Sequence, residues 1–259
     1  MSAGQMLPAG LSRGVLVRVF LRSLFLQAGW NPLGMQNLGM AYALYPALRA
    51  LYPEGPALKA AVQRHLAFFN THPYVAGAIL GGALFHESRI AHGEEDASSV
   101  VAFKAALMGP LAALGDGFFW LSLKPAVGAL SAGLVPLIGA WSVLLYLVLY
   151  NVVHLGLRAR LYWLGLTRGD ALVEEVARVR LPQRGALLRN LAAGCAGGLA
   201  VWAAFLLGAQ QGGAQSGPLL TAGCLLLGAL AYRALGWRVT RYGALYLSAG
   251  LAILAGALI

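Results

Sequence analysis

The sequence predicts an all-α integral membrane protein, and its composition and uncharged runs carry that prediction. Hydrophobic residues make up 59% of the 259-residue chain and charged residues only 11%, whereas a soluble domain has about 45–50% apolar and about 25% charged residues. The mean hydropathy is +0.70. Several uncharged runs approach the roughly 20 residues that cross a bilayer. We therefore expect one membrane domain, residues 1–259.

The first helical segment is amphipathic rather than uniformly apolar. Arg13, Arg18 and Arg22 interrupt an otherwise apolar run, which is typical of a helix lying in the membrane interface. The start of the chain lacks the compact basic stretch, clean apolar run and small-residue cleavage site of a secretory signal. We therefore expect an interfacial helix here.

The following apolar runs are too short or too interrupted to be simple spans. They are residues 38–51, which Tyr52-Pro53 ends, residues 74–85, and residues 107–123, which Gly109-Pro110 and the glycines around Asp116 interrupt. Broken segments of this kind are typical of re-entrant hairpins and discontinuous helices, which persist only beside protein or a water-filled cavity. Residues 11–124 are thus predicted to be an interfacial and re-entrant half that holds the substrate path.

Residues 125–259 are predicted to be a transmembrane helical half. The expected spans are residues 134–153, 191–208, 218–235 and 242–259. Between the first two lies a basic segment, 158–189, with arginines at 158, 160, 168, 178, 180, 184 and 189. The positive-inside rule assigns this segment to the cytoplasm. Cys195 and Cys224 lie in Gly/Ala-rich runs and are expected to pack as small apolar residues.

The net charge of +10 indicates contact with lipid headgroups rather than with nucleic acid. The cations stand in short patches beside apolar segments, and the large polar basic face of a nucleic-acid binder is lacking. The sequence also has no metal-ligand spacing, no G-x-S-x-G motif and no glycine-rich phosphate loop. We expect no catalytic residue, metal or cofactor on this chain.

Two polar clusters near the start of the chain are candidates for a ligand site. They are Trp30, Asn31, Gln36 and Asn37, and Asn70, Thr71 and His72. Amide and hydroxyl groups can bond the hydroxyls of a sugar while aromatic faces cover its C–H groups. Each residue alone is more typical of a cap or a satisfied core group. Two such clusters together favour a sugar-facing or gating site.

Two carboxylates extend the set of candidates. A charge near membrane depth costs at least ~2.5 kcal/mol unless it is paired or faces water. Glu87 either forms a salt bridge with Arg89 or Arg64, or it accepts hydrogen bonds from sugar hydroxyls or acts as a gate residue. Asp116 either caps the half-helix that follows it or lines the pathway. The sequence leaves both alternatives open.

Four blocks of sequence resemble a known family. They are RSLFLQAGWN (22–31), MQNLGMAYA (35–43), RHLAFFNTHP (64–73) and KAALMGPLA (104–112). Their content, order and spacing are similar to the IID component of the mannose/fructose/sorbose class of the bacterial phosphotransferase system, over residues 13–160. The resemblance implies a membrane subunit that works with a IIC subunit to bind and translocate a hexose, which IIB phosphorylates on the cytoplasmic side.

The same resemblance implies the protein's surroundings. The phosphoryl group passes from phosphoenolpyruvate through enzyme I and HPr to phosphohistidines on IIA and IIB, and IID carries none. Expected partners are the IIC subunit, the IIA and IIB phosphocarriers, the hexose and the lipid bilayer, in a trimer of IIC–IID heterodimers. The implied location is the bacterial cytoplasmic (inner) membrane, with several passes.

Two departures from the family pattern support an alternative function. Gly117 stands where the family usually has a proline after the glycine-aspartate pair, and Ser88 follows Glu87 where the family tends to have a second acid. The alternative is a non-transporting membrane sensor or docking protein that keeps the IID fold. An unrelated secondary transporter is a third hypothesis, for which Glu87 and Asp116 are the available intramembrane carboxylates.

Overall fold

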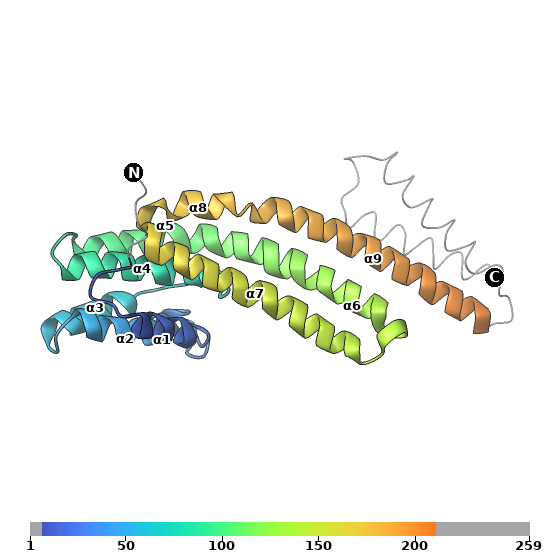
Figure 1. Cartoon of the computed structure of the whole chain (residues 1–259), viewed down its shortest axis with the longest axis horizontal. Helices are drawn as coiled ribbons and strands as arrows, with labels where there is room; N and C mark the ends of the chain where they lie inside the picture. The colour runs from blue at the N-terminus through green and yellow to red at the C-terminus, as the bar shows by residue number, and fades with distance from the viewer. Residues whose placement is uncertain (1–6, 211–259) are drawn as a thin grey trace. The chain divides into compact units, whose positions relative to one another are not determined.

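The computed structural model describes residues 7–210, and its regular elements are helices (Figure 1). They are α1 (Arg13–Ser23), α2 (Asn37–Leu51), α3 (Pro56–His65), α4 (Ala76–Ala91), α5 (Ala97–Gly115), the π-helix η1 (Asp116–Leu123), α6 (Lys124–Ile138), α7 (Trp141–Arg168), the short 3-10 helix η2 (Gly169–Ala171), α8 (Leu172–Arg178) and α9 (Leu181–Gln210). Within residues 7–210, β pairing is limited to isolated bridges. The predicted all-α class is confirmed.

The chain forms two compact units. The first contains Met1–Val127 and Val143–Arg189, and the second contains Gly128–Ser142 and Asn190–Ile259. In the second unit, small residues of α6 lie beside α9, where a Cβ on Gly133 would be in ordinary contact with Leu199. Cys195 is half-buried in α9, as expected for a small packing residue. Cys224 and the expected spans 218–235 and 242–259 lie outside the described residues.

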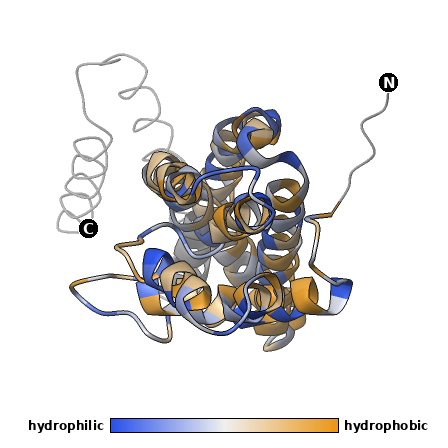
Figure 2. Cartoon of the chain, turned by 90° about the vertical axis from the view of Figure 1, so that its left-hand side faces the viewer, coloured by the Kyte–Doolittle hydropathy of each residue, from blue (hydrophilic) through white to orange (hydrophobic). Residues whose placement is uncertain are grey.

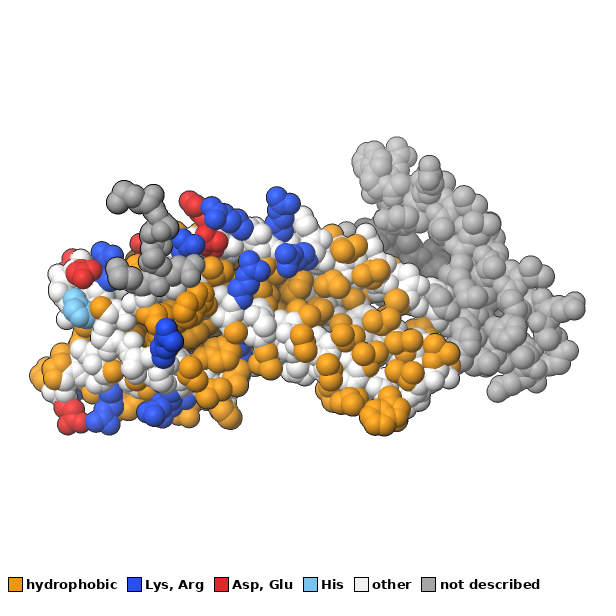
Figure 3. All heavy atoms as spheres, in the orientation of Figure 1, with side chains coloured by type: hydrophobic (Ala, Val, Ile, Leu, Met, Phe, Trp, Pro, Cys, Tyr) orange, Lys and Arg blue, Asp and Glu red, His pale blue; other side chains and the backbone are white. Residues whose placement is uncertain are grey.

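In the part of the chain that the structure describes, two helical stretches are long and apolar enough to cross a membrane, namely Ala97–Ile138 and Trp141–Gly197. The surface of α6 and α7 is correspondingly apolar (Figure 3). Leu137, Trp141 and Val152 are each about two-thirds exposed or more, at 78%, 71% and 66%. Side chains of this kind on a helix surface are compatible with contact to lipid.

The predicted span 134–153 is wrong as a single helix. Ile138 ends α6 and Trp141 begins α7. Between them Gly139 takes the left-handed backbone conformation, with φ of 55°, which glycine adopts easily at a helix end. Hydrophobicity runs unbroken across this turn, so an uncharged run did not reveal where one helix ends and the next begins.

The break predicted within residues 107–123 also differs from the structure. Helix α5 passes through Pro110, and the chain continues without a turn through η1 into α6. Asp116 begins η1 inside this continuous stretch, so it does not cap a separate half-helix. The glycines around Asp116 permit the wider turns of a π-helix, and π-helical segments occur often at functional sites.

The amphipathic helix predicted at the start is confirmed as α1. Ser12 caps it, with its Oγ accepting from the backbone N–H of Val15 at 3.3 Å. Leu16 and Val19 are buried, and α1 packs against α2. Gly39 of α2 lets the turn that follows α1 approach closely, because a Cβ there would meet the carbonyl of Leu26. Hydrophilic and hydrophobic residues are interspersed along the helices at this end of the chain (Figure 2).

Glycines also bring α4 against α7. A Cβ on Gly81 would meet the backbone of Tyr162 and Leu166, and a Cβ on Gly165 would meet the backbone of Ala78 and Gly82. The two helix backbones are therefore in direct contact at this crossing. Close contact through small residues is typical of helices in membranes.

We expect Gly165→Ala to lower the free energy of unfolding by about 1–3 kcal/mol, because the added methyl group must push two backbones apart. Gly156→Ala is the matched control on the same helix, since a Cβ there meets nothing within 4 Å and alanine raises helix propensity. Thermal denaturation in detergent, followed by size-exclusion chromatography, compares them. Equal melting temperatures would contradict the proposed backbone contact.

Candidate functional site

The structure brings the two predicted polar clusters together. Residues 34–36 lie beside residue 69, with the Gln36 N–H donating to the Phe69 carbonyl at 2.8 Å and the Phe69 N–H donating to the Gly34 carbonyl at 3.3 Å. A parallel bridge joins Met35 and Phe69. Segments separated by more than thirty residues thus form one local structure, which we call the paired loops (residues 29–37 and 66–72).

Side-chain amides hold the paired loops in place. Gln36 is buried, and its amide group bonds the backbone of Thr71 twice: Nε2 donates to the carbonyl at 2.7 Å and Oε1 accepts from the N–H at 3.0 Å. The Nδ2 of Asn37 donates to the carbonyl of Leu66 at 2.7 Å. These amides replace the backbone partners that an irregular loop otherwise lacks.

Asn31 and Trp30 lie at the turn that leads into α2. The Oδ1 of Asn31 accepts from the Gly34 N–H at 2.8 Å, and its Nδ2 donates to Asn37 Oδ1 at 3.0 Å. Met35 takes a left-handed conformation, with φ of 58°, so that the turn can close. Trp30 is 54% exposed and therefore presents its indole at the surface.

The second loop ends in buried polar atoms that have no partner among the described residues. His72 is 2% exposed, and its Nδ1 accepts from the Tyr74 N–H at 3.2 Å. The neutral ring therefore carries its hydrogen on Nε2, and this atom and the Oγ1 of Thr71 are both buried and unpartnered within residues 7–210. A buried polar group without a partner costs about 1–3 kcal/mol. Asn70, just before them, is half-buried.

Aromatic rings surround His72. The ring of Phe119 stacks on it, with centroids 5.2 Å apart and planes at 12°, and the rings of Trp120 and Tyr74 lie 4.9 and 5.0 Å away. A Cβ on Gly115 would meet the His72 ring, so the glycine lets η1 approach. Burial lowers the pKa of His72 to about 4, which keeps the ring neutral at neutral pH.

Asp116 lies on the same helical stretch, next to Gly115. It is half-buried, and it is not part of the charged network around Glu87. The sequence alternative in which Asp116 caps a half-helix is excluded by the continuous helix, so its place near the pathway stays a prediction.

Glu87 is fully buried and forms the charged network that the sequence suggested. Arg64 binds it with two nitrogens, Nε to Oε1 at 2.6 Å and Nη2 to Oε2. His65 Nε2 lies 2.8 Å from Oε1, and the Tyr52 hydroxyl donates to Oε2 at 2.5 Å. Of the two partners that the sequence left open, Arg64 is therefore the one used. Arg89 pairs with Glu95 at 2.5 Å instead.

Lys104 completes this network, which we call the Glu87 network (Tyr52, Arg64, His65, Glu87 and Lys104). Its Nζ donates to the Arg64 carbonyl at 2.6 Å and lies 3.3 Å from His65 Nδ1. Tyr52, His65 and Lys104 are not among the site residues that the sequence predicted. The available signal was Lys104 itself, a lone cation in an apolar helix, which needs a partner when buried.

The network keeps its two acid–base partners in defined states. Burial raises the pKa of Glu87, but the hydrogen bonds from Arg64 and His65 outweigh it and lower the pKa to about 2. Burial lowers the pKa of His65 to about 4. Glu87 is thus a carboxylate and His65 a neutral imidazole at physiological pH, with Nε2–H facing Glu87 and Nδ1 facing Lys104.

Arg158 is a further buried cation, and its position differs from the expectation that residue 158 begins an exposed basic segment. It lies within α7, is 2% exposed, and its Nη2 donates to the Ser23 carbonyl. Arg158 ties α7 to the end of α1. Its spacing from Arg160 resembled a solvated basic patch, and sequence alone gave no sign of the burial.

The fold and the site define a helical membrane protein in which a charged network and paired polar loops lie beside an aromatic cluster. The family model described as PTS system mannose/fructose/sorbose family IID component matches residues 10–201. The chain belongs to this family, as the resemblance predicted.

Curated relatives agree with this assignment. The mannose-specific EIID component of Escherichia coli strain K12 is 42% identical over 160 residues, 61% of this chain and 56% of that protein. The sorbose-specific EIID component of Klebsiella pneumoniae is 35% identical over 167 residues, 64% of this chain and 61% of that protein. The aligned region thus spans less than two thirds of the length of these relatives.

Solved structures extend the similarity to nearly the whole chain. A chain in the cryo-EM structure of the mannose transporter ManYZ with microcin E492 matches with a TM-score of 0.60 and 28% identity, covering 95% of this chain and 96% of that one. A second structure, described as a membrane protein, matches with a TM-score of 0.67 and 31% identity over the same shares.

Breaking the Glu87 network is expected to destabilise the protein strongly. Glu87→Gln leaves the cations of Arg64 and Lys104 buried without their carboxylate, and a loss of about 3–5 kcal/mol is expected for a broken buried ion pair. Glu94→Gln is the control, because that side chain is 56% exposed and such changes stay within about 0.5 kcal/mol. Thermal denaturation in detergent measures both.

The double variant Arg64→Gln/Glu87→Gln separates pairing from packing. Removing both charges relieves the uncompensated cation, so the double variant is expected to melt above Glu87→Gln alone. A double variant that melts lower than either single variant would contradict this account of the network.

Acid is expected to destabilise the protein in two ranges. His65 and His72 have ordinary pKa values of 6.5 and folded values of about 4, so the unfolded state binds protons first and stability falls as pH drops from 6.5 to 4. Glu87 has a lowered pKa, so its contribution is present above pH 4.5 and is lost as pH falls toward 2.

His65→Gln is expected to reduce the loss of stability between pH 6.5 and 4. The loss that remains is the part due to His72. Melting temperatures across this range measure the slope, which is informative even if the variant is less stable at neutral pH. An unchanged slope in both His65→Gln and His72→Gln would refute the neutral state of these rings.

Proposed function

We propose that this chain is the IID membrane subunit of a mannose-type phosphotransferase permease, which works with a IIC subunit to bind and translocate a hexose. In this proposal IIB phosphorylates the sugar on the cytoplasmic side, and the present chain carries no phosphohistidine. The family membership supports the subunit type. The relatives described as mannose-, sorbose- and fructose-specific support a six-carbon sugar as the substrate class.

The observation that carries the site assignment is the pair of unpartnered polar atoms at the end of the paired loops. The Oγ1 of Thr71 and the Nε2–H of His72 are buried within the described structure, and Asn70 adds an amide beside them. A sugar hydroxyl can both donate and accept, so it satisfies either atom. Trp120, whose ring lies 4.9 Å from that of His72, offers an aromatic face for the C–H side of the ring.

The other candidate residues support this site at a distance from the sugar. Asn31, Gln36 and Asn37 fix the paired loops through hydrogen bonds within the chain, and Trp30 flanks them at the surface. Glu87 fixes the end of α3, one loop before Asn70. Asp116 stands at the start of η1, which carries Phe119 and Trp120 to His72. We assign these residues to a gate or supporting role.

The proposed setting is the bacterial cytoplasmic membrane, which the chain crosses more than once. The helices α5 to α9 provide the apolar stretches, and the arginines from 168 to 189 favour a cytoplasmic position for the α7–α9 connection. The similarity to a chain of the ManYZ transporter supports a IIC partner. The IIA and IIB phosphocarriers and a trimer of IIC–IID heterodimers complete the proposed assembly.

The site is tested in the complex reconstituted with its cognate IIC. We expect Asn70→Ala and Thr71→Val each to weaken hexose binding by about 2–12-fold, the effect of one hydrogen bond of about 0.5–1.5 kcal/mol, and His72→Ala to act in the same direction. Asn151→Ala is the control, since that side chain is exposed and bonds only its own helix. Binding of a hexose panel by calorimetry measures the effect. Unchanged binding in all three variants would overturn the assignment.

The alternative of a sensor or docking protein is separated by a second assay. Membranes with the full set of phosphotransferase proteins are supplied with phosphoenolpyruvate and a hexose panel, with and without this chain. Phosphorylation that depends on the chain supports the permease subunit. Binding of IIC without phosphorylation of any hexose would instead favour the non-transporting protein.

A further inference from the structure

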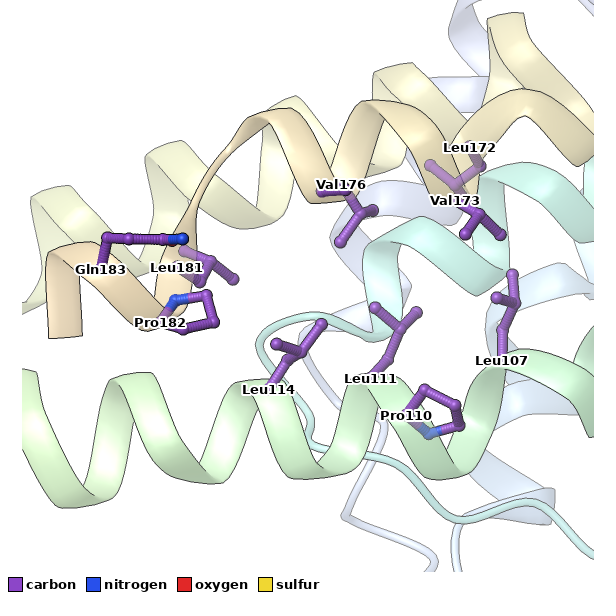
Figure 4. A pocket seen from close by; sticks show the side chains of 11 residues that line it. Leu107, Pro110, Leu111, Leu114, Leu172, Val173, Val176, Leu181, Pro182 and Gln183 are labelled. Carbon is purple, nitrogen blue, oxygen red and sulfur yellow. The ribbon is translucent and has the colours of Figure 1, made fainter. Parts of the chain in front are cut away.

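An apolar groove of about 340 Å³ lies between α5 and the α8–α9 connection (Figure 4). Its floor consists of buried aliphatic side chains from both sides: Leu107, Leu111, Leu172, Val176 and Leu181. Gln183 is the polar side chain at one end. The volume falls at the lower end of the range for small-molecule sites, and the lining offers almost nothing that a polar ligand could bond.

The walls of the groove are exposed although they are apolar. Val173 is 56% exposed, and Pro110 and Pro182 on opposite walls are exposed as well. Helix α5 and the α7–α9 region belong to the two stretches that are apolar enough to cross a membrane. The groove therefore joins an apolar wall on α5 to the basic α8–α9 connection, as expected at the boundary between hydrocarbon and headgroups.

Basic residues stand next to the lining residues in the sequence. Arg180 and Arg184 are exposed and directly flank the lining segment 181–183. No carboxylate within residues 7–210 lies within 4.0 Å of either guanidinium, whereas Arg178 pairs with Glu174 and Glu175. Figure 3 shows Lys and Arg side chains gathered over α8 and the start of α9.

We propose that this groove binds one anionic phospholipid of the surrounding membrane, with an acyl chain between α5 and α8 and the phosphate held by Arg180 and Arg184. The occupant needs a hydrocarbon part to fill the aliphatic floor and an anionic part to meet the two guanidiniums, which have no carboxylate partner within the described residues. An anionic lipid combines the two, and basic pockets between membrane helices bind such headgroups. A bound lipid would join α5 to the α8–α9 connection.

A second groove provides an internal comparison. It lies between α1 and α7, has a volume of about 460 Å³ and is lined by Leu16, Phe20, Tyr162 and their neighbours, with Arg13 as its one cationic lining residue. If an apolar groove beside any arginine were sufficient, Arg13 would matter as much as Arg180 and Arg184. Arg13→Gln is therefore the matched control.

The experiment measures lipid binding to the full-length purified chain. Native mass spectrometry counts bound phosphatidylglycerol and phosphatidylcholine as each is titrated, and inorganic phosphate is titrated separately. We expect one phosphatidylglycerol to remain bound in preference to phosphatidylcholine, and phosphate alone not to compete. Arg180→Gln and Arg184→Gln should each weaken the binding about fivefold, while Arg13→Gln should leave it unchanged.

Val176→Trp tests the acyl-chain half of the proposal by filling the floor of the groove, and it should remove the preferential phosphatidylglycerol. The arginine variants are at exposed positions, so they remain informative if Val176→Trp does not fold. Equal phosphatidylglycerol binding by the wild type and the double arginine variant would overturn the proposal. So would equal binding of the two lipids or competition by phosphate alone.

Discussion

The buried carboxylate of Glu87 is the constraint on which the arrangement of α2, α3, α4 and α5 depends. It lies on α4 and bonds Tyr52, just after α2, and Arg64 and His65, at the end of α3. Lys104 brings α5 into the same network. Because a buried charge is tolerated only when it is paired and hydrogen-bonded, these contacts fix where α3 ends. The loop that leaves α3 is the one that carries Asn70, Thr71 and His72.

The paired loops show a different use of polar groups. The side-chain amides of Gln36 and Asn37 donate to backbone carbonyls of the other loop. In contrast, Thr71 and His72 each have a side-chain atom without a partner in the described chain. The amides of the first loop therefore hold the paired loops in place, and the second loop carries the polar atoms that can bond a ligand. This division explains why amides recur in a chain that otherwise avoids polar residues.

The composition and the family motifs predicted the fold class and the amphipathic α1. They also marked both paired loops as candidates for a ligand site. The turn at Gly139 was not predicted, because the hydrophobicity of the sequence does not change across it. The continuity of α5, η1 and α6 was not predicted, because Pro110 and the glycines near Asp116 suggest breaks in a helix. Whether such residues break a helix depends on what packs against them. Arg158 was assigned to the cytoplasmic basic segment because its partner, the carbonyl of Ser23, lies 135 positions away in sequence. Tertiary contacts of this kind leave no local pattern.

The π-helical segment η1 carries the aromatic residues that contact His72 and continues directly into α6. Its geometry therefore also determines how α6 is rotated about its own axis. A π-helix is bonded from i to i+5 and so takes more residues per turn than an α-helix, and returning η1 to α-helical geometry at the same length would rotate everything downstream. Phe119 and Trp120 would keep their place beside His72 only if α6 presented a different face. The helix type of this short segment thus sets the helical phase at which α6 begins, without any change in the composition of α6.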